Sequence, residues 1–191
     1  MFSRDSEPEI RHSSDIDRAG IDIDCRICTV DAGDRRSGSA AVAVKPIYNP
    51  HTKSYFELRV DLPEPPNWHT AARYARTKKF KGVRGRLAQV RDLKTHSFLQ
   101  ANFEIREESW IGLRYYCSFR KLVWADGDVQ PRKGFKMWAK RWHRTRIRCG
   151  AANIPYMPVY YLPFDKGFRW QASGPAKSFV SYFVEYPTGK E

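Results

Sequence analysis

The chain has 191 residues, of which 41% are hydrophobic and 14% aromatic, and its formal net charge at pH 7 is +13. This length suits one domain of ordinary size plus an arm, and no apolar run approaches the roughly 20 residues that a membrane-spanning helix needs. The positive charge favours an acidic partner: nucleic acid, an anionic glycan, a lipid headgroup or an acidic protein surface.

The charge is divided unevenly along the chain. Residues 1–34 hold nine Asp or Glu and four Arg, whereas residues 76–148 hold twenty Lys or Arg and six acids. We expect residues 1–39 to form an extended acidic arm without a signal peptide, because the first ten residues contain no apolar segment. The arm could anchor the protein by docking on a basic surface, in its own chain or in a neighbouring copy. Alternatively, the two regions are solvated independently.

The folded body is predicted to span residues 40–187, followed by a tail over 188–191. Its first elements are two strand-like segments that flank an Asn-Pro-His-Thr-Lys turn at residues 49–53. Apolar and aromatic residues alternate on both sides of this turn, which is typical of a β-hairpin. We therefore expect the body to begin with a hairpin.

Two helices are predicted after the hairpin. Asn67 can cap a helix over residues 68–80, in which Trp68 and three alanines recur at helical spacing. Asp92 can cap a second helix. Its apolar positions at three- and four-residue steps are His96, Leu99 and Phe103.

The rest of the body is predicted to be strands and one long excursion. Residues 109–119, 121–128, 157–164 and 178–187 are rich in aromatic and β-branched residues, while the stretch over 128–155 is basic and irregular. A hairpin, two helices and then strands predict an α+β fold.

Four cysteines are present: Cys25, Cys28, Cys117 and Cys149. So few cysteines in a chain of this length favour reduced thiols over a disulfide framework. Cys25-x-x-Cys28 supplies only half of a zinc site, and the other two cysteines have no His at ligand spacing. The sequence therefore predicts no disulfide and no metal.

Several segments, taken in order, resemble motifs of the C-type lectin fold. They are Trp68-x-x-Ala71-x-x-x-Ala75, Gly85–Val90, Trp110–Leu113, Trp124–Gly127, Phe168–Trp170 and Phe183–Tyr186. The resemblance spans about residues 40–187 and implies that four tryptophans belong to the core. These are Trp68, Trp110, Trp124 and Trp170. It also implies that Trp138, in the long loop, is packed.

The sequence departs from calcium-dependent members of this family. Those proteins hold the cation with a loop motif such as Glu-Pro-Asn and a later Trp-Asn-Asp, because a hard divalent ion needs several oxygen ligands. Here the corresponding segments are 138–142, which is cationic, and Trp170-Gln171-Ala172. We therefore expect no calcium site and no cofactor. The usual cysteines are replaced at Ala75 and Val184, as in the disulfide-free members from bacteriophages and bacteria.

The long excursion is the candidate ligand-binding site, because the fold usually carries its binding function there and loops on a rigid scaffold suit variable contacts. The guanidinium groups present forked donors that match phosphate and carboxylate, and a Trp adds a flat surface. The predicted site residues are Arg132, Lys133, Lys136, Lys140, Arg141, Trp142, Arg144 and Arg146. The alternative is that these charges form a solvated face.

No catalytic arrangement is evident, since the five histidines are scattered and Asp126 and Asp128 lie in a turn. We expect a non-enzymatic lectin-like module of a bacteriophage virion, made in the host cytoplasm. Its expected partners are other virion proteins, or copies of itself, through residues 1–39, and an acidic host-surface glycan or lipopolysaccharide. One alternative is a purely structural assembly protein. A nucleic-acid-binding protein is less favoured, because no known nucleic-acid-binding motif is present.

Overall fold

The structure is a computed structural model that describes residues 45–60, 63–140, 149 and 154–191. The predicted arm, 1–39, lies outside the described residues, so the domain boundaries remain predictions. Within the described part, no helix has the length and apolar character needed to cross a membrane.

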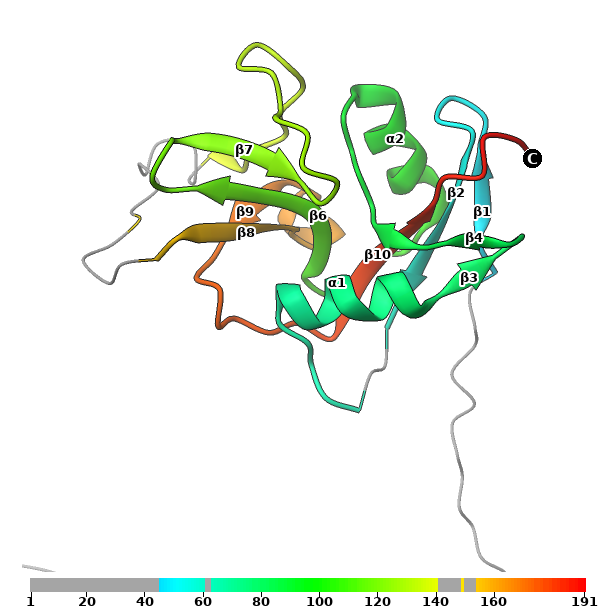
Figure 1. The fold of residues 1–191 in the computed structure, drawn as a ribbon, viewed down its shortest axis with the longest axis horizontal. Coiled ribbons are helices and arrows are strands. Elements are labelled where there is room, and N and C mark those ends of the chain that lie inside the picture. The colour runs from blue at the N-terminus through cyan, green and yellow to red at the C-terminus, as the bar shows by residue number, and fades with distance from the viewer. Residues whose placement is uncertain (1–44, 61–62, 141–148, 150–153) are drawn as a thin grey trace, which may run out of the picture. The chain divides into compact units, whose positions relative to one another are not determined.

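The predicted α+β architecture is confirmed: two helices and a mostly antiparallel sheet form the body (Figure 1). The order of neighbouring strands in the main sheet is β1-β2-β10-β6-β8-β9, with β5 beside β10 and β7 beside β6; β10 and β6 run parallel. The strands of this sheet are β1 (Ile47–Asn49), β2 (Ser54–Arg59), β5 (Arg86–Leu87), β6 (Ser109–Tyr116), β7 (Lys121–Trp124), β8 (Tyr156–Tyr161), β9 (Trp170–Ala172) and β10 (Ser181–Tyr186).

Both helices begin at the predicted caps. Helix α1 (Trp68–Thr77) follows Asn67, whose side chain accepts a hydrogen bond from the Thr70 amide at 3.0 Å. Helix α2 (Leu93–Asn102) follows Asp92, which accepts from the Thr95 amide at 2.8 Å. Each cap satisfies one of the amides that a helix start leaves without an intrahelical partner.

Helix α1 ends three residues earlier than predicted. Lys78 is already extended, and the next residues form β3 (Lys79–Phe80), which pairs with β4 (Val83–Arg84). The predicted hairpin at residues 49–53 is confirmed by the antiparallel pairing of β1 and β2. Strand β9 was not predicted, because three residues are too few to show an alternating pattern.

The sheet has a core on each face, and Figure 1 shows α1 and α2 on opposite sides of β10. Tyr182 and Val184 of β10 and Trp110 of β6 are buried with α1, whereas Phe183 and Ile111 are buried with α2. This follows from the two-residue period of a strand, which sends neighbouring side chains to opposite faces. The four tryptophans predicted to be core are all at most 3% exposed.

Two reciprocal hydrogen bonds join strand β6 to the start of α1. The Trp68 indole donates to the Ile111 carbonyl at 2.7 Å, and the Trp110 indole donates to the Pro66 carbonyl at 2.9 Å. Gly112 follows Ile111 in β6, and its amide donates to the Ala88 carbonyl at 2.8 Å. The Trp-Ile-Gly-Leu segment is therefore the contact point of helix, sheet and the connection between the helices.

The expectation of a reduced, disulfide-free domain is wrong. Cys117, directly after β6, forms a disulfide with Cys149, and their Cα atoms are 5.7 Å apart. The Cys117 amide also donates to the Pro155 carbonyl at 3.1 Å, so the chain leaves β6 and returns to the same place before β8. The pairing depends on this return, which cysteine spacing alone does not show.

Replacing Gly112 by Ala should destabilise the domain. A Cβ at this position would lie 2.6 Å from the Leu87 carbonyl oxygen and 3.1 Å from that of Ala88, so the backbone would have to move. Overpacking of this kind costs about 1–3 kcal/mol, measured as a lower midpoint of urea denaturation. The control is Gly174→Ala, where the added carbon meets no atom within 4 Å. Equal midpoints for the two variants would contradict the close approach.

Removing the disulfide should also lower the free energy of unfolding, by about 2–4 kcal/mol, because the bridge restricts a long loop in the unfolded chain. The measurement compares urea denaturation of the full chain with that of a Cys117→Ser/Cys149→Ser variant. A Cys25→Ser/Cys28→Ser variant is the control and should keep the parental midpoint. Free thiols at 117 and 149 in the purified protein, detected by mass spectrometry, would overturn the assignment.

Candidate functional site

The predicted basic site is described as far as Lys140. Arg132 and Lys136 line a pocket, whereas Lys133 and Lys140 are exposed and do not line it. Arg141, Trp142, Arg144 and Arg146 lie outside the described residues. Two of the predicted site residues thus lie in one pocket, beside other residues that were not predicted from the sequence.

This pocket, called here the hairpin pocket, has a volume of about 600 Å³ and lies between the β6–β7 hairpin and the segment that follows β7. Four of the described lining residues are cationic and none carries a carboxylate. The lining residues are Tyr115, Phe119, Arg120, Lys121, Leu122, Val129, Gln130, Pro131, Arg132, Lys136 and Trp138. A site with this lining attracts anions and also offers apolar surface to a ring.

The floor of the hairpin pocket is fixed by buried hydrogen bonds. The buried Gln130 side chain accepts from the Trp124 indole at 2.7 Å and donates to the Phe135 carbonyl at 2.7 Å. Trp138 packs edge-on against Trp170, with ring centroids 5.6 Å apart. The prediction that Trp138 is packed is confirmed, and its half-buried ring forms one wall of the pocket.

The carboxylates after β7 are engaged by arginines. Arg91 donates to Asp126 at 2.7 Å and to Asp128 at 2.8 Å, and Arg86 reaches Asp126 at 3.4 Å. Burial by itself would raise the pKa of Asp126, but hydrogen bonds from Gln89 and the Asp128 amide, with the charges of Arg91 and Arg86, hold the pKa below its usual range. Both groups are ion-paired, which does not suit an acid–base pair.

The buried histidine belongs to the core. The His96 Nδ1 atom lies 2.8 Å from the Tyr161 hydroxyl, and its ring stacks on Phe168 with centroids 5.0 Å apart. Burial, and then the positive charge of Arg169, lowers the pKa of His96 to about 4. The imidazole is therefore neutral at pH 7 and serves as a packed, hydrogen-bonded group that does not line the hairpin pocket.

The segment that the family resemblance matches to the Trp-Asn-Asp calcium motif forms β9. In β9, Gln171 accepts a hydrogen bond from the Tyr160 hydroxyl at 2.8 Å, and Ala172, which has no side-chain oxygen, follows it. Elsewhere in the described ranges, no group of three or more His, Cys, Asp or Glu is placed to hold a metal ion. A ligand at the hairpin pocket would meet the cationic side chains directly.

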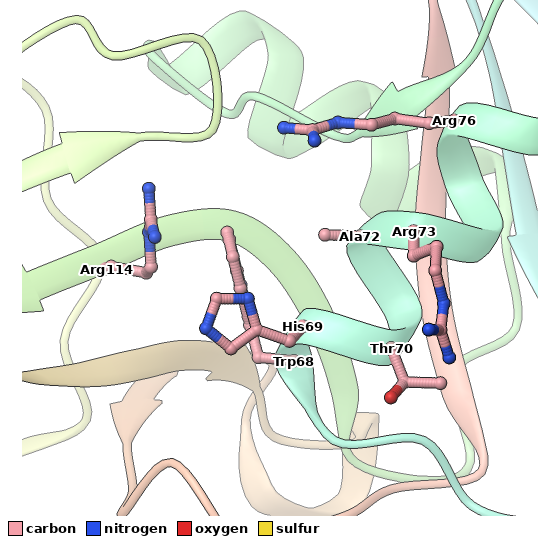
Figure 2. Close-up of a pocket in the computed structure, with 7 residues that line it drawn as sticks. All are labelled: Trp68, His69, Thr70, Ala72, Arg73, Arg76 and Arg114. Atoms are coloured by element: carbon pink, nitrogen blue, oxygen red, sulfur yellow. The ribbon is translucent and has the colours of Figure 1, made fainter.

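A second pocket, called here the arginine pocket, lies between α1 and β6 and has a volume of about 440 Å³. Figure 2 shows its lining residues, which are Trp68, His69, Thr70, Ala72, Arg73, Arg76 and Arg114. This pocket was not predicted from the sequence. The available signal was the helical spacing of His69, Arg73 and Arg76 beside the buried face of α1, but no local pattern placed Arg114 opposite them.

No protein-family model and no curated protein matches the sequence. Solved structures do match. The human scavenger receptor C-type lectin carbohydrate-recognition domain has a TM-score of 0.53 at 16% identity, covering 74% of this chain and 97% of that one. For the mouse domain the TM-score is 0.52 at 16% identity, covering 72% and 95%. For the cow CD23 carbohydrate-recognition domain it is 0.50 at 16% identity, covering 70% and 87%. The domain has the C-type lectin fold.

The lectin-like domain presents a cationic pocket on each face of β6. Arg114 points into the arginine pocket, and its neighbour Tyr115 lines the hairpin pocket on the other face. The rings of Tyr116 and Phe119 stack with centroids 5.0 Å apart at the end of the strand. Phe119 also lines the hairpin pocket, whereas neither ring lines the arginine pocket.

Proposed function

We propose that this lectin-like domain binds an anionic glycan at the hairpin pocket without calcium. The observation that carries the proposal is the set of four cations around an apolar pocket whose described lining includes no carboxylate. The fold supports a glycan as the ligand class: the matching cow CD23 domain is a carbohydrate-recognition domain, solved in the presence of a GlcNAc2Man3 oligosaccharide.

The pocket offers separate contacts to the charged and the apolar parts of such a ligand. Arg120 and Arg132 can donate forked hydrogen bonds to a sulfate, phosphate or carboxylate group, and Lys136 adds a compact charge. Phe119 and Val129, which both line the pocket, are 51% and 50% exposed. They provide a surface on which the C–H face of a sugar ring can rest.

Neutral substitution of Lys136 should weaken binding. In Lys136→Gln a charge-assisted contact is lost, and we expect roughly a tenfold rise in the dissociation constant for a sulfated oligosaccharide. The measurement is isothermal titration calorimetry at low salt, with a neutral oligosaccharide of equal length as reference and with or without chelator. Lys133→Gln is the matched control, because Lys133 is exposed in the same segment but does not line the pocket.

Three outcomes would contradict the proposal. Loss of binding on adding chelator would make the interaction metal-dependent, and equal weakening by the two lysine variants would make it a general charge effect. Binding to duplex DNA with a salt slope equivalent to several phosphates, and no glycan binding, would favour a nucleic-acid partner instead.

We further propose that the protein is a component of a bacteriophage virion and that residues 1–39 anchor it there, to copies of itself or to other virion proteins. The support is the sequence: an acidic segment precedes a strongly basic body. Opposite charges of this kind favour association between copies. The expected lack of disulfides was one reason to infer a phage origin. That reason no longer applies, because Cys117 and Cys149 are bonded.

Neutralising the arm should reduce assembly without affecting the lectin-like domain. In a full-length variant with Asp15, Asp17, Asp22 and Asp24 changed to Asn, we expect less protein in purified particles, measured by quantitative mass spectrometry. Affinity for the sulfated oligosaccharide should stay at the parental value. Unchanged incorporation of this variant would contradict an electrostatic anchor, and absence of the parental protein from particles would contradict the virion role.

A further inference from the structure

We propose that the arginine pocket is a second ligand site, which binds a phosphate or sulfate group carried on a small ring. It is separate from the hairpin pocket and does not depend on the function proposed for that pocket.

Two arginines from different elements converge on one space. Figure 2 shows Arg114, from β6, and Arg76, from α1, extending toward the same opening, with the His69 ring at its edge. Arg73 also lines the pocket, but its guanidinium extends away from Arg114 along the other side of α1. A ligand in the opening would therefore meet Arg76 and Arg114 together.

Arg114 is held in place by aromatic rings. Its guanidinium carbon lies 4.5 Å from the ring centre of Trp68, 5.1 Å from that of Tyr116 and 5.4 Å from that of Tyr156. Packing a guanidinium among rings restricts its motion but uses none of its N–H donors. The buried Nε atom has no hydrogen-bond partner among the described residues. The group is thus fixed in position without donating a hydrogen bond to any described residue.

The positive charge in this pocket is not balanced by the part of the chain that the structure describes. None of its lining residues is acidic, and no described carboxylate pairs with Arg76 or Arg114. Arg86 and Arg91, by contrast, are paired with Asp126. Two permanently charged guanidinium groups facing one space repel each other, and an anion between them would remove this repulsion.

The size of the pocket indicates the ligand class. A volume of about 440 Å³ falls within the roughly 300–1,000 Å³ that is usual for small-molecule sites. A bare tetrahedral ion would leave most of it empty. Guanidinium groups match the oxygens of phosphate and sulfate through paired N–H donors. The geometry therefore fits a monoester whose anionic group lies between the arginines and whose ring fills the remaining space.

The test uses the full-length protein with glucose 6-phosphate as the probe and glucose, inorganic phosphate and inorganic sulfate as references, by isothermal titration calorimetry at low salt. We expect the phosphate ester to bind at least tenfold more tightly than glucose. Inorganic phosphate and sulfate should compete with it. Binding of inorganic phosphate as tight as that of the ester would overturn the part of the proposal that assigns space to a ring.

Three arginine variants locate the site. Arg76→Gln should weaken ester binding at least tenfold, and so should Arg114→Lys, which keeps the charge but loses the forked donors. Arg84→Gln removes the same charge from exposed β4, which lines neither pocket, and should change the affinity less than twofold. Equal losses in Arg84→Gln and Arg76→Gln would overturn the proposal, because they would show general attraction to a basic surface.

Two further measurements test whether the variants are folded and which pocket binds the ester. Unchanged urea denaturation midpoints for Arg76→Gln and Arg84→Gln would show that both variants are folded. Lys136→Gln, in the hairpin pocket, should leave ester binding unchanged, whereas weakening there would assign the ester to the other pocket and overturn this inference. Failure of glycan binding at the hairpin pocket would leave the ester result intact, so the two proposals can fail separately.

Discussion

The reciprocal hydrogen bonds of Trp68 and Trp110 connect the helical and sheet parts of this domain. Each indole N–H reaches a backbone carbonyl of the other segment, at Ile111 and Pro66, and both rings are at most 3% exposed. Hydrogen bonds in such a dry environment are electrostatically stronger than in water, and losing one would leave a buried polar group unpaired. The bonds therefore fix the position of α1 against β6. The arginine pocket depends on that position, because one of its walls comes from each element.

The distribution of charged partners explains why the pockets are cationic. In the described part of the domain, Asp126, Asp128 and Glu185 are hydrogen-bonded or paired to Arg86 and Arg91, around the connection between the helices. Both pockets therefore lack carboxylates among their described lining residues. The net charge of +13 indicated an acidic partner but not a location. Because these carboxylates pair with Arg86 and Arg91, they do not balance the positive charge of the two pockets.

Features encoded by neighbouring residues could be predicted from the sequence, and features created by the topology could not. The caps at Asn67 and Asp92 depend on residues three positions away, so they were found, as were the buried tryptophans of the family-like motifs. The Cys117–Cys149 disulfide joins two ends of a long excursion whose return beside β6 is a tertiary property. It was missed for that reason.

The candidate site shows the same division. The basic composition of the excursion predicted Arg132, Lys133, Lys136 and Lys140 alike, and only the structure shows that Arg132 and Lys136 line a pocket whereas Lys133 and Lys140 do not. Arg120 and Lys121 come from the preceding hairpin, and their part in the same pocket follows from its fold. The pairing of Arg76 with Arg114 likewise depends on two elements that are distant in the sequence.

The alternating side chains of β6 place a constraint on how this protein can vary. Consecutive residues, Arg114 and Tyr115, form walls of different pockets on opposite faces of one strand. Insertion or deletion of a single residue within the strand would exchange the two faces and damage both pockets at once. The specificities of the two pockets can therefore diverge by substitution, while their spacing along the strand is inherited as a unit.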